Sequence, residues 1–329
     1  MLTNGGGWTE KRHCERLNEI VFGAAAAKAG GFDPFTDDAE QPMFDGTELV
    51  QCHTPLLKLL PEYHDKFVLV AGIKDTIDVI NGYGFKNAIH TEELAALIPA
   101  LSPLTLRSLP ESLMHDRKQA VLKRFGMTAP ELTSKLQFDA IFMACDVFCY
   151  ELNLQIFTDL IMSKEGRLGT RRTDFSEKQH VKLFLTNPDL EYADSYSLPR
   201  QSGQYPFLLA LQSYLGAVFD GFQAEFTQYG KPSALSFEYA EEVLREQAAN
   251  NGVDISEIYM IGDNPKGDIV GSNRMGKGWN SMLVQSGIYK PENRHLLQGD
   301  EVPTFEVKNM EEAVRKIIEK ERLGEFVRL

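Results

Sequence analysis

Two aspartates, Asp263 and Asp268, stand where a parallel α/β sheet is expected to bind a metal. The short apolar run from Ile258 to Ile261 predicts a buried strand that stops at Gly262, and Asp268 is expected to open a helix after a short loop. Open parallel sheets bind ligands at the carboxyl ends of their strands. Two carboxylates so placed suit Mg²⁺, which binds one or two carboxylates together with phosphate oxygens. A surface turn with two solvated aspartates is the alternative interpretation.

Two further segments carry groups that bind anions. Thr3 and Asn4 offer a hydroxyl and an amide, and Gly5 follows them with a backbone N–H at a predicted helix start, where anions are favoured. Lys231 offers a cation just before a helix that Pro232 begins. Each segment has a plainer alternative, because Thr-Asn-Gly is also a common turn sequence and a single lysine is often a solvated surface group.

Two adjacent pairs of reactive residue types are weaker candidates. Cys52 and His53 suggest zinc, but no second Cys or His pair stands at ligand spacing, so a structural role is favoured. Cys145 with Asp146 suggests a nucleophile site, although a buried thiol is the favoured interpretation.

Composition excludes several classes of function. The 329 residues carry a formal charge of -13, whereas nucleic-acid-binding proteins show a basic surface, so we expect no nucleic-acid partner. The four cysteines form no CxxC pair and no disulfide-dense pattern, which favours a reducing compartment. No apolar run is long enough to span a membrane, and no secretory signal is present, so we expect a chain that is not membrane-spanning.

Apolar strand-like segments alternate with helical ones along the chain. The expected strands include residues 49–52, 67–71, 138–144, 181–185, 258–261 and 281–284, and the expected helices include residues 151–162, 207–218 and 234–249. This alternation indicates parallel α/β units. We expect a core made of residues 1–66 and 205–329, with residues 67–204 inserted as a second α/β domain.

The order of these segments resembles that of the haloacid dehalogenase superfamily, and specifically subclass IIA, which inserts a large α/β cap between its second and third motifs. Closer still, the chain is similar to the cat eye syndrome critical region protein family, also called haloacid dehalogenase-like hydrolase domain-containing protein five. The segments that carry this resemblance are Leu2-Thr3-Asn4-Gly5-Gly6, Cys52-His53-Thr54-Pro55, Thr186-Asn187-Pro188-Asp189, Tyr229-Gly230-Lys231-Pro232 and Gly262-Asp263-Asn264-Pro265.

The resemblance implies roles for the candidate residues. Thr3 and Lys231 would hold the phosphoryl group, and Asp263 and Asp268 would hold Mg²⁺. Asn4, Gly5 and Asn264 would contact the substrate, a small phosphorylated molecule that the cap selects. The fold implied is a Rossmann-like core, a parallel sheet with helices, carrying the inserted α/β cap.

One motif of the superfamily is missing from these residues. The reaction begins with attack on phosphorus by the first aspartate of an Asp-x-Asp-Gly motif, and the second aspartate acts as general acid and base. The sequence contains no such motif, and Met1 falls within the strand that ends at Thr3. We therefore expect that the first central strand is missing, that the beginning is cut, and that the chain as written is inactive.

Two functional hypotheses follow from different classes. The first is a phosphatase-like, Mg²⁺-dependent hydrolase whose nucleophile is absent from these residues. The alternative is a non-catalytic ligand-binding or regulatory protein that retains the cap and the phosphate pocket. The resemblance implies a mitochondrial location, with the cytoplasm as the alternative, and a link to glycerophospholipid biosynthesis. A homodimer is left open.

Overall fold

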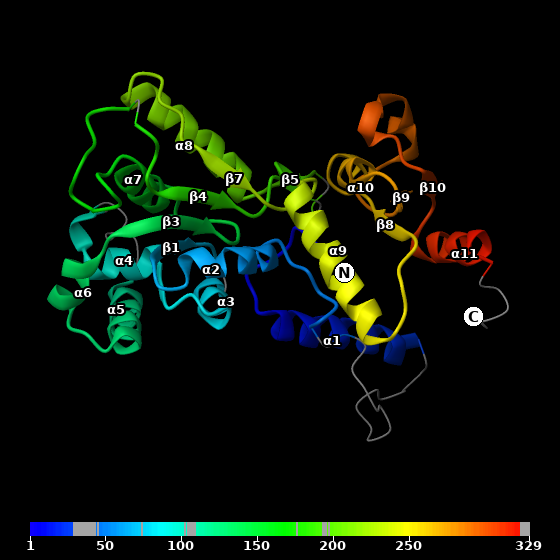
Figure 1. Ribbon diagram of the computed structural model, residues 1–329, viewed down its shortest axis with the longest axis horizontal. Helices are drawn as coiled ribbons and strands as arrows, with labels where there is room; N and C mark the ends of the chain where they lie inside the picture. Colours follow the sequence, from blue (N-terminus) through cyan, green and yellow to red (C-terminus); the bar gives the residue numbers. More distant parts are fainter. Residues whose placement is uncertain are drawn as a thin grey trace. The chain divides into compact units, whose positions relative to one another are not determined.

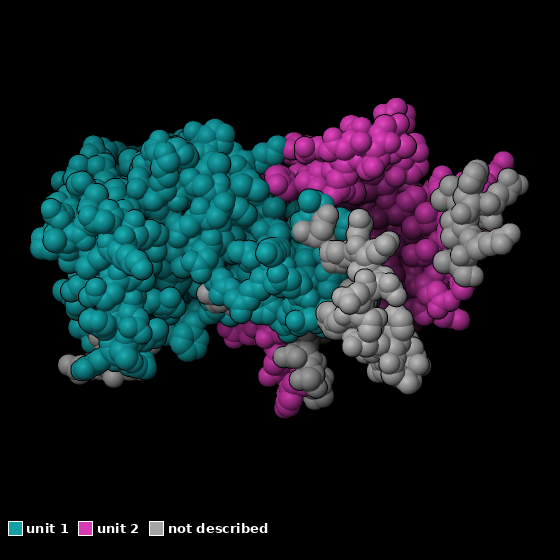
Figure 2. Space-filling model, turned by 90° about the horizontal axis from the view of Figure 1, so that it is seen from below, with its two compact units in different colours: residues 1–188, 203–228 teal, residues 189–202, 229–329 magenta. Residues whose placement is uncertain are grey.

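The computed structural model describes residues 1–28, 44, 46–73, 75–101, 103, 110–175, 177–192, 196 and 198–322, with the side chains of residues 22–28 left aside (Figure 1). The chain forms two compact units. Unit 1 contains residues 1–188 and 203–228, and unit 2 contains residues 189–202 and 229–329 (Figure 2). Each unit is built on a parallel sheet.

Unit 1 contains a five-stranded sheet of order β2-β1-β3-β4-β7, in which all neighbouring strands are parallel. The strands are β1 (Phe67–Ala71), β2 (Asn87–His90), β3 (Phe138–Met143), β4 (Lys182–Leu185) and β7 (Phe226–Gln228). The central strands read as nearly continuous apolar runs because both faces of a parallel sheet are covered.

Unit 1 also contains ten helices and helical turns among its described residues, several of which cover the two faces of this sheet. They are α1 (Glu10–Lys28), η1 (Thr54–Leu59), α2 (Leu60–Tyr63), α3 (Thr76–Gly82), α4 (Thr91–Leu97), η2 (Pro99–Leu101), α5 (Glu111–Phe125), α6 (Ala129–Lys135), α7 (Tyr150–Ile161) and α8 (Gln204–Val218). In Figure 1, α7 and α8 lie on one side of the sheet and α2 and α3 on the other. Side chains alternate accordingly: Ile141 and Leu183 pack with α7 and α8, whereas Phe142 and Phe184 pack on Tyr63 of α2.

Unit 2 contains a three-stranded parallel sheet of order β10-β9-β8 and a short antiparallel pair. The strands are β5 (Glu191–Tyr192), β6 (Arg200–Gln201), β8 (Ile258–Gly262), β9 (Trp279–Val284) and β10 (Phe305–Val307). The helices are α9 (Ala234–Asn250), the π-helical turn η4 (Pro265–Ile269), α10 (Val270–Met275), η5 (Pro291–Leu296), η6 (Gly299–Glu301) and α11 (Met310–Lys320). The predicted α/β class with parallel sheets is confirmed.

The structure differs from the expected boundaries in two places. The five-stranded sheet continues beyond residue 204, because β7 pairs with β4 and α8 packs in the same core. The expected strand at residues 49–52 is reduced to a single parallel bridge between Leu2 and Val50. Residues 1–66 group with this sheet by their contacts, and the division of the chain into a core and an inserted cap stays a proposal.

None of the helices in the described residues combines the length and apolar character that crossing a membrane requires.

Candidate functional site

Asp263 directly follows β8, at the carboxyl end of the strand. Its Oδ2 atom accepts a hydrogen bond from the backbone N–H of Ile288 at 2.7 Å, and its carbonyl oxygen accepts one from Tyr289 at 3.1 Å. A Cβ atom at Gly287 would lie 1.9 Å from Oδ2, so only glycine leaves room for the carboxylate there. Within the described part of the chain Oδ1 accepts no hydrogen bond. One oxygen of this carboxylate is therefore available to a ligand.

Asp268 is almost fully buried, with 2% of its surface exposed. Its Oδ1 atom accepts a hydrogen bond from Nζ of Lys231 at 2.6 Å, and its Oδ2 atom accepts one from the backbone N–H of Asn264 at 3.0 Å. A Cβ atom at Gly262 would lie 2.2 Å from this carboxylate. Gly262 thus lets the carboxylate of Asp268 lie directly against the end of β8.

The turn that joins the two aspartates starts earlier than we expected. The side-chain oxygen of Asn264 accepts hydrogen bonds from the backbone N–H groups of Lys266 at 3.0 Å and Gly267 at 3.3 Å. With this cap and Pro265 in the first turn, the helical conformation begins at Pro265. The expectation that Asp268 opens the helix was wrong, because Asp268 lies inside the π-helical turn, where its side chain points back to β8.

Lys231 is held just before α9. The preceding Gly230 donates its backbone N–H to Oγ of the buried Ser236 at 2.8 Å, and its carbonyl accepts from the N–H of Ser233. The Lys231 side chain is 14% exposed and forms its ion pair with Asp268. Unit 2 therefore brings together four of the predicted site residues: Lys231, Asp263, Asn264 and Asp268.

Thr3, Asn4 and Gly5 lie in unit 1. The backbone N–H of Gly5 donates to Oγ1 of Thr3 at 3.0 Å, and the N–H of Thr3 donates to the carbonyl of Val50 at 3.0 Å. These bonds form a closed turn at the end of the short parallel bridge. That these residues meet the aspartates of unit 2 stays a prediction.

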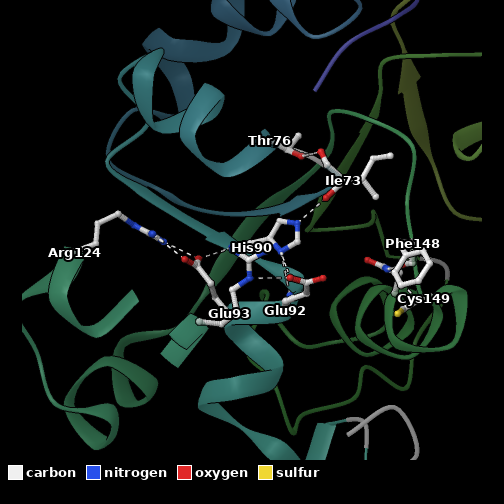
Figure 3. Close-up of polar contacts among 11 residues, drawn as sticks. Ile73, Thr76, His90, Glu92, Glu93, Arg124, Phe148 and Cys149 are labelled. Carbon is white, nitrogen blue, oxygen red and sulfur yellow. Dashed lines mark hydrogen bonds and ion pairs between the residues drawn. The ribbon is translucent and has the colours of Figure 1, made fainter. Parts of the chain in front are cut away.

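Two features of the structure were not predicted from the sequence. One is the pair of glycines, Gly262 and Gly287, that make room for the carboxylates. The other is a buried polar cluster at the ends of β1 and β2 (Figure 3). In this cluster Nε2 of His90 donates to the carbonyl of Gly72 at 2.8 Å, and Nδ1 accepts from the N–H of Glu92 at 3.2 Å. Glu93 is buried and receives two bonds from the guanidinium of Arg124, at 2.8 and 2.7 Å. These contacts cap and anchor α4. The Glu three residues after the His90 cap was the sequence signal for them.

Comparisons with known proteins identify the family. Residues 228–313 match the family described as HAD-hydrolase-like. The chain is 28% identical over 345 residues to a mitochondrial hydrolase of Saccharomyces cerevisiae, covering 97% of this chain and 86% of that protein. It is 31% identical over 319 residues to a cardiolipin synthase (CMP-forming)/mitochondrial hydrolase fusion protein of Schizosaccharomyces pombe, covering 95% of this chain and 45% of that protein.

A solved structure shows the same fold. The crystal structure of a 4-nitrophenylphosphatase from Thermotoga maritima superposes with a TM-score of 0.54 and 16% identity, covering 95% of this chain and 82% of that chain. The family match covers β8, the turn with both aspartates and Lys231, which are the residues that form the site in unit 2. The chain therefore belongs to the haloacid dehalogenase superfamily, as a subclass IIA-like member.

Proposed function

We propose that this protein is a Mg²⁺-dependent, phosphatase-type hydrolase of small phosphorylated molecules. The observation that carries the proposal is the arrangement at the carboxyl end of β8, where Asp263 follows the strand and the carboxylate of Asp268 lies against Gly262 and pairs with Lys231. Two carboxylates at the ends of one turn, with a lysine from the segment before α9 paired to one of them, suit a phosphate group that arrives with a divalent metal. The names of the relatives, which are hydrolases and a phosphatase, support this reading.

The residues fit a magnesium ion. Carboxylate oxygens are the ligands that Mg²⁺ prefers, and it commonly takes one or two carboxylates and completes its shell with water and phosphate oxygens. Among the described residues no group of three His, Cys, Asp or Glu side chains could hold a metal. We propose Asp263 and Asp268 as its two protein ligands. Gly262 and Gly287 provide the space that both carboxylates occupy. When bound, the ion would neutralise charge on the phosphate.

The other residues would bind and orient the substrate. Lys231 would hold a phosphoryl oxygen while its contact with Asp268 fixes the position of Nζ. Thr3 would offer its hydroxyl, and the turn at Asn4 and Gly5 its backbone N–H groups and side-chain amide. Asn264 would contact the substrate from the turn that it caps. We propose that the inserted domain, expected at residues 67–204 and here extended to residue 228 because β7 pairs with β4, acts as the cap that selects the substrate.

The 329 residues contain no Asp-x-Asp-Gly, so we propose that these residues alone do not turn over substrate. The same fact favours the second candidate, a ligand-binding or regulatory protein that uses the cap and the phosphate pocket without catalysis. We also propose a mitochondrial location and a link to glycerophospholipid biosynthesis, because two relatives are named mitochondrial and one of them is fused to a cardiolipin synthase. Light scattering would test whether the chain forms a homodimer.

The decisive experiment compares two chains with p-nitrophenyl phosphate and Mg²⁺. One is the 329-residue chain, and the other is extended upstream by a strand that carries Asp-x-Asp-Gly. We expect turnover only from the extended chain, and its loss in Asp263→Asn. Comparable turnover by the short chain would refute the proposed role of the motif. If the extended chain is also inactive, but Mg²⁺ or phosphate raises the melting temperature of both, the binding protein is the better description.

A further inference from the structure

The turn at Gly5 and Gly6 rests directly on the side chain of a buried histidine. A Cβ atom at Gly6 would lie 2.8 Å from Cδ2 and 3.3 Å from Nε2 of His53, and 2.5 Å from Sγ of Cys52. The backbone N–H of Cys52 also donates to the carbonyl of Gly5 at 3.3 Å. The turn at Gly5 and Gly6 therefore packs directly against the Nε2 side of the imidazole ring.

The other edge of the same imidazole belongs to a chain of hydrogen bonds. Nδ1 of His53 lies 2.8 Å from the hydroxyl oxygen of Tyr83, and that hydroxyl lies 2.5 Å from Oε1 of Glu10, the first residue of α1. Thr54 also donates its hydroxyl to Oε1 of Glu10, at 2.8 Å. His53 is fully buried, and Tyr83 of α3 connects it to the partly exposed carboxylate.

The direction of these bonds fixes the proton on the imidazole. Burial, with the nearby charge of Glu10 as a second cause, raises the pKa of Tyr83 far above its usual value, so the hydroxyl stays protonated. A carboxylate can only accept, so the single hydroxyl proton of Tyr83 points to Glu10. The hydroxyl oxygen must then accept from His53, which places a proton on Nδ1. In the neutral ring Nε2 is consequently the atom without a proton, and it faces Gly6.

We propose that Glu10, Tyr83 and His53 form a positioning chain that holds the peptides of Gly5 and Gly6 in the geometry that binds phosphate. The inference rests on the proposed function, which places a phosphoryl group at Thr3, Asn4 and Gly5. His53 is a positioning residue, because it acts through the backbone of the turn. The carboxylate orients the hydroxyl, the hydroxyl orients the imidazole, and the imidazole supports the turn.

Two readouts on the 329-residue chain test this inference. The first is the ¹⁵N spectrum of the seven histidines, in which the signal of His53 is assigned by its loss in His53→Gln. We expect the pattern of a ring protonated at Nδ1, and in Tyr83→Phe, which removes only the hydroxyl, a change of that pattern. The second is the affinity for inorganic phosphate, measured by ³¹P line broadening. We expect it to fall about fivefold in Tyr83→Phe, the effect of one lost neutral hydrogen bond.

Substitutions of the histidine separate its two edges. The amide nitrogen of Asn can replace the Nδ1 donor, whereas the amide of Gln reaches the position of Nε2. If support of the turn is what matters, His53→Gln keeps more phosphate affinity than His53→Asn. A purely structural hydrogen bond to Tyr83 predicts the opposite order. The control is Tyr150→Phe, which removes a hydroxyl that donates to the carbonyl of Gly203 at 3.0 Å in the same unit, and which should leave both readouts unchanged.

The outcomes distinguish this inference from the function on which it rests. Wild-type chain that binds no phosphate would overturn the proposed phosphate site, and the inference with it. Phosphate affinity that is present and equal in Tyr83→Phe would overturn the inference alone. A His53 signal that shows the proton on Nε2 would also overturn it, whatever the affinity.

Discussion

Removal of the Lys231 ammonium group should destabilise unit 2 strongly. In Lys231→Met the carboxylate of Asp268 keeps the backbone N–H of Asn264 at 3.0 Å but loses the ion pair with Nζ at 2.6 Å, while 2% of the residue is exposed. The methionine side chain has nearly the same length as the lysine stem. The variant therefore tests the charge rather than the packing.

The size of the effect follows from the geometry. At 2.6 Å and an effective dielectric constant of about 20, two unit charges attract each other by about 6 kcal/mol. Solvation of a free lysine offsets part of this, and breaking a buried pair at one partner usually costs about 3–5 kcal/mol. Because Asp268 retains one hydrogen bond, we expect a loss of about 3 kcal/mol in the free energy of unfolding of unit 2.

The assay is urea unfolding followed by tryptophan fluorescence. The chain has two tryptophans, and in a Trp8→Phe background Trp279 of β9 reports on unit 2 alone. The cycle also includes Asp268→Asn and the double variant, for which we expect a coupling energy of about 2 kcal/mol. Effects that add within about 0.5 kcal/mol would show that the two side chains do not interact, and would refute the geometry of the site.

Three further predictions concern other parts of the chain. Glu93→Gln should cost about 2–3 kcal/mol in unit 1, because it leaves a partly buried guanidinium of α5 without its carboxylate, and hydrogen exchange of residues 91–97 should rise accordingly. Gly287→Ala should abolish the rise in melting temperature caused by Mg²⁺, since its Cβ would displace the carboxylate of Asp263. Burial, and secondly the charge of Glu92, raise the pKa of Cys149. Its alkylation by iodoacetamide should therefore keep accelerating above the ordinary pKa of a thiol, and Glu92→Gln should speed it at lower pH, as peptide mass spectrometry would show.

Each of these has a control or a contradicting result. For the glycine, the matched control is Gly82→Ala, where nothing lies within 4 Å of the added Cβ and the Mg²⁺ effect should persist. An unchanged Mg²⁺ effect in Gly287→Ala would contradict the crowding argument. Unchanged exchange in Glu93→Gln would mean that the ion pair contributes nothing to α4. Alkylation of Cys149 that levels off at or below the usual thiol pKa would contradict the raised pKa.

Strands whose own residues specify them were predictable from the sequence. Phe67–Ala71 was predicted with both ends correct, because the run FVLVA is uninterrupted and Gly72 follows it. In the structure Gly72 has a φ of +150°, a conformation that favours glycine. By contrast, β7 consists of three residues, Phe226–Gln228, which carry too little pattern to indicate a strand. β7 forms because it pairs with β4, and nothing in residues 226–228 themselves predicts that pairing.

In the candidate site, too, features set by adjacent residues could be predicted, whereas contacts between residues far apart in the sequence could not. The early start of the turn at Pro265 was readable, since Asn264 followed by proline is a strong helix-start signal. The role of Gly287 was not, because it depends on where the chain returns past Asp263 after β9. Residue types on one turn could be predicted, and contacts between distant glycines and carboxylates could not.

The glycine turn of unit 1 is held from the sheet side as well as by His53. The backbone N–H of Asp75, after β1, donates to the carbonyl of Gly7 at 2.8 Å, and Sγ of Cys145, after β3, lies 3.5 Å from the carbonyl of Gly6. Both loops follow the carboxyl ends of adjacent parallel strands. If the turn binds phosphate, the loops of the proposed cap that would meet the substrate also set the position of the peptides that bind its phosphoryl group. Substrate selection and phosphate binding would then depend on the same two loops, so a substitution in either loop should change both the substrate preference and the phosphate affinity.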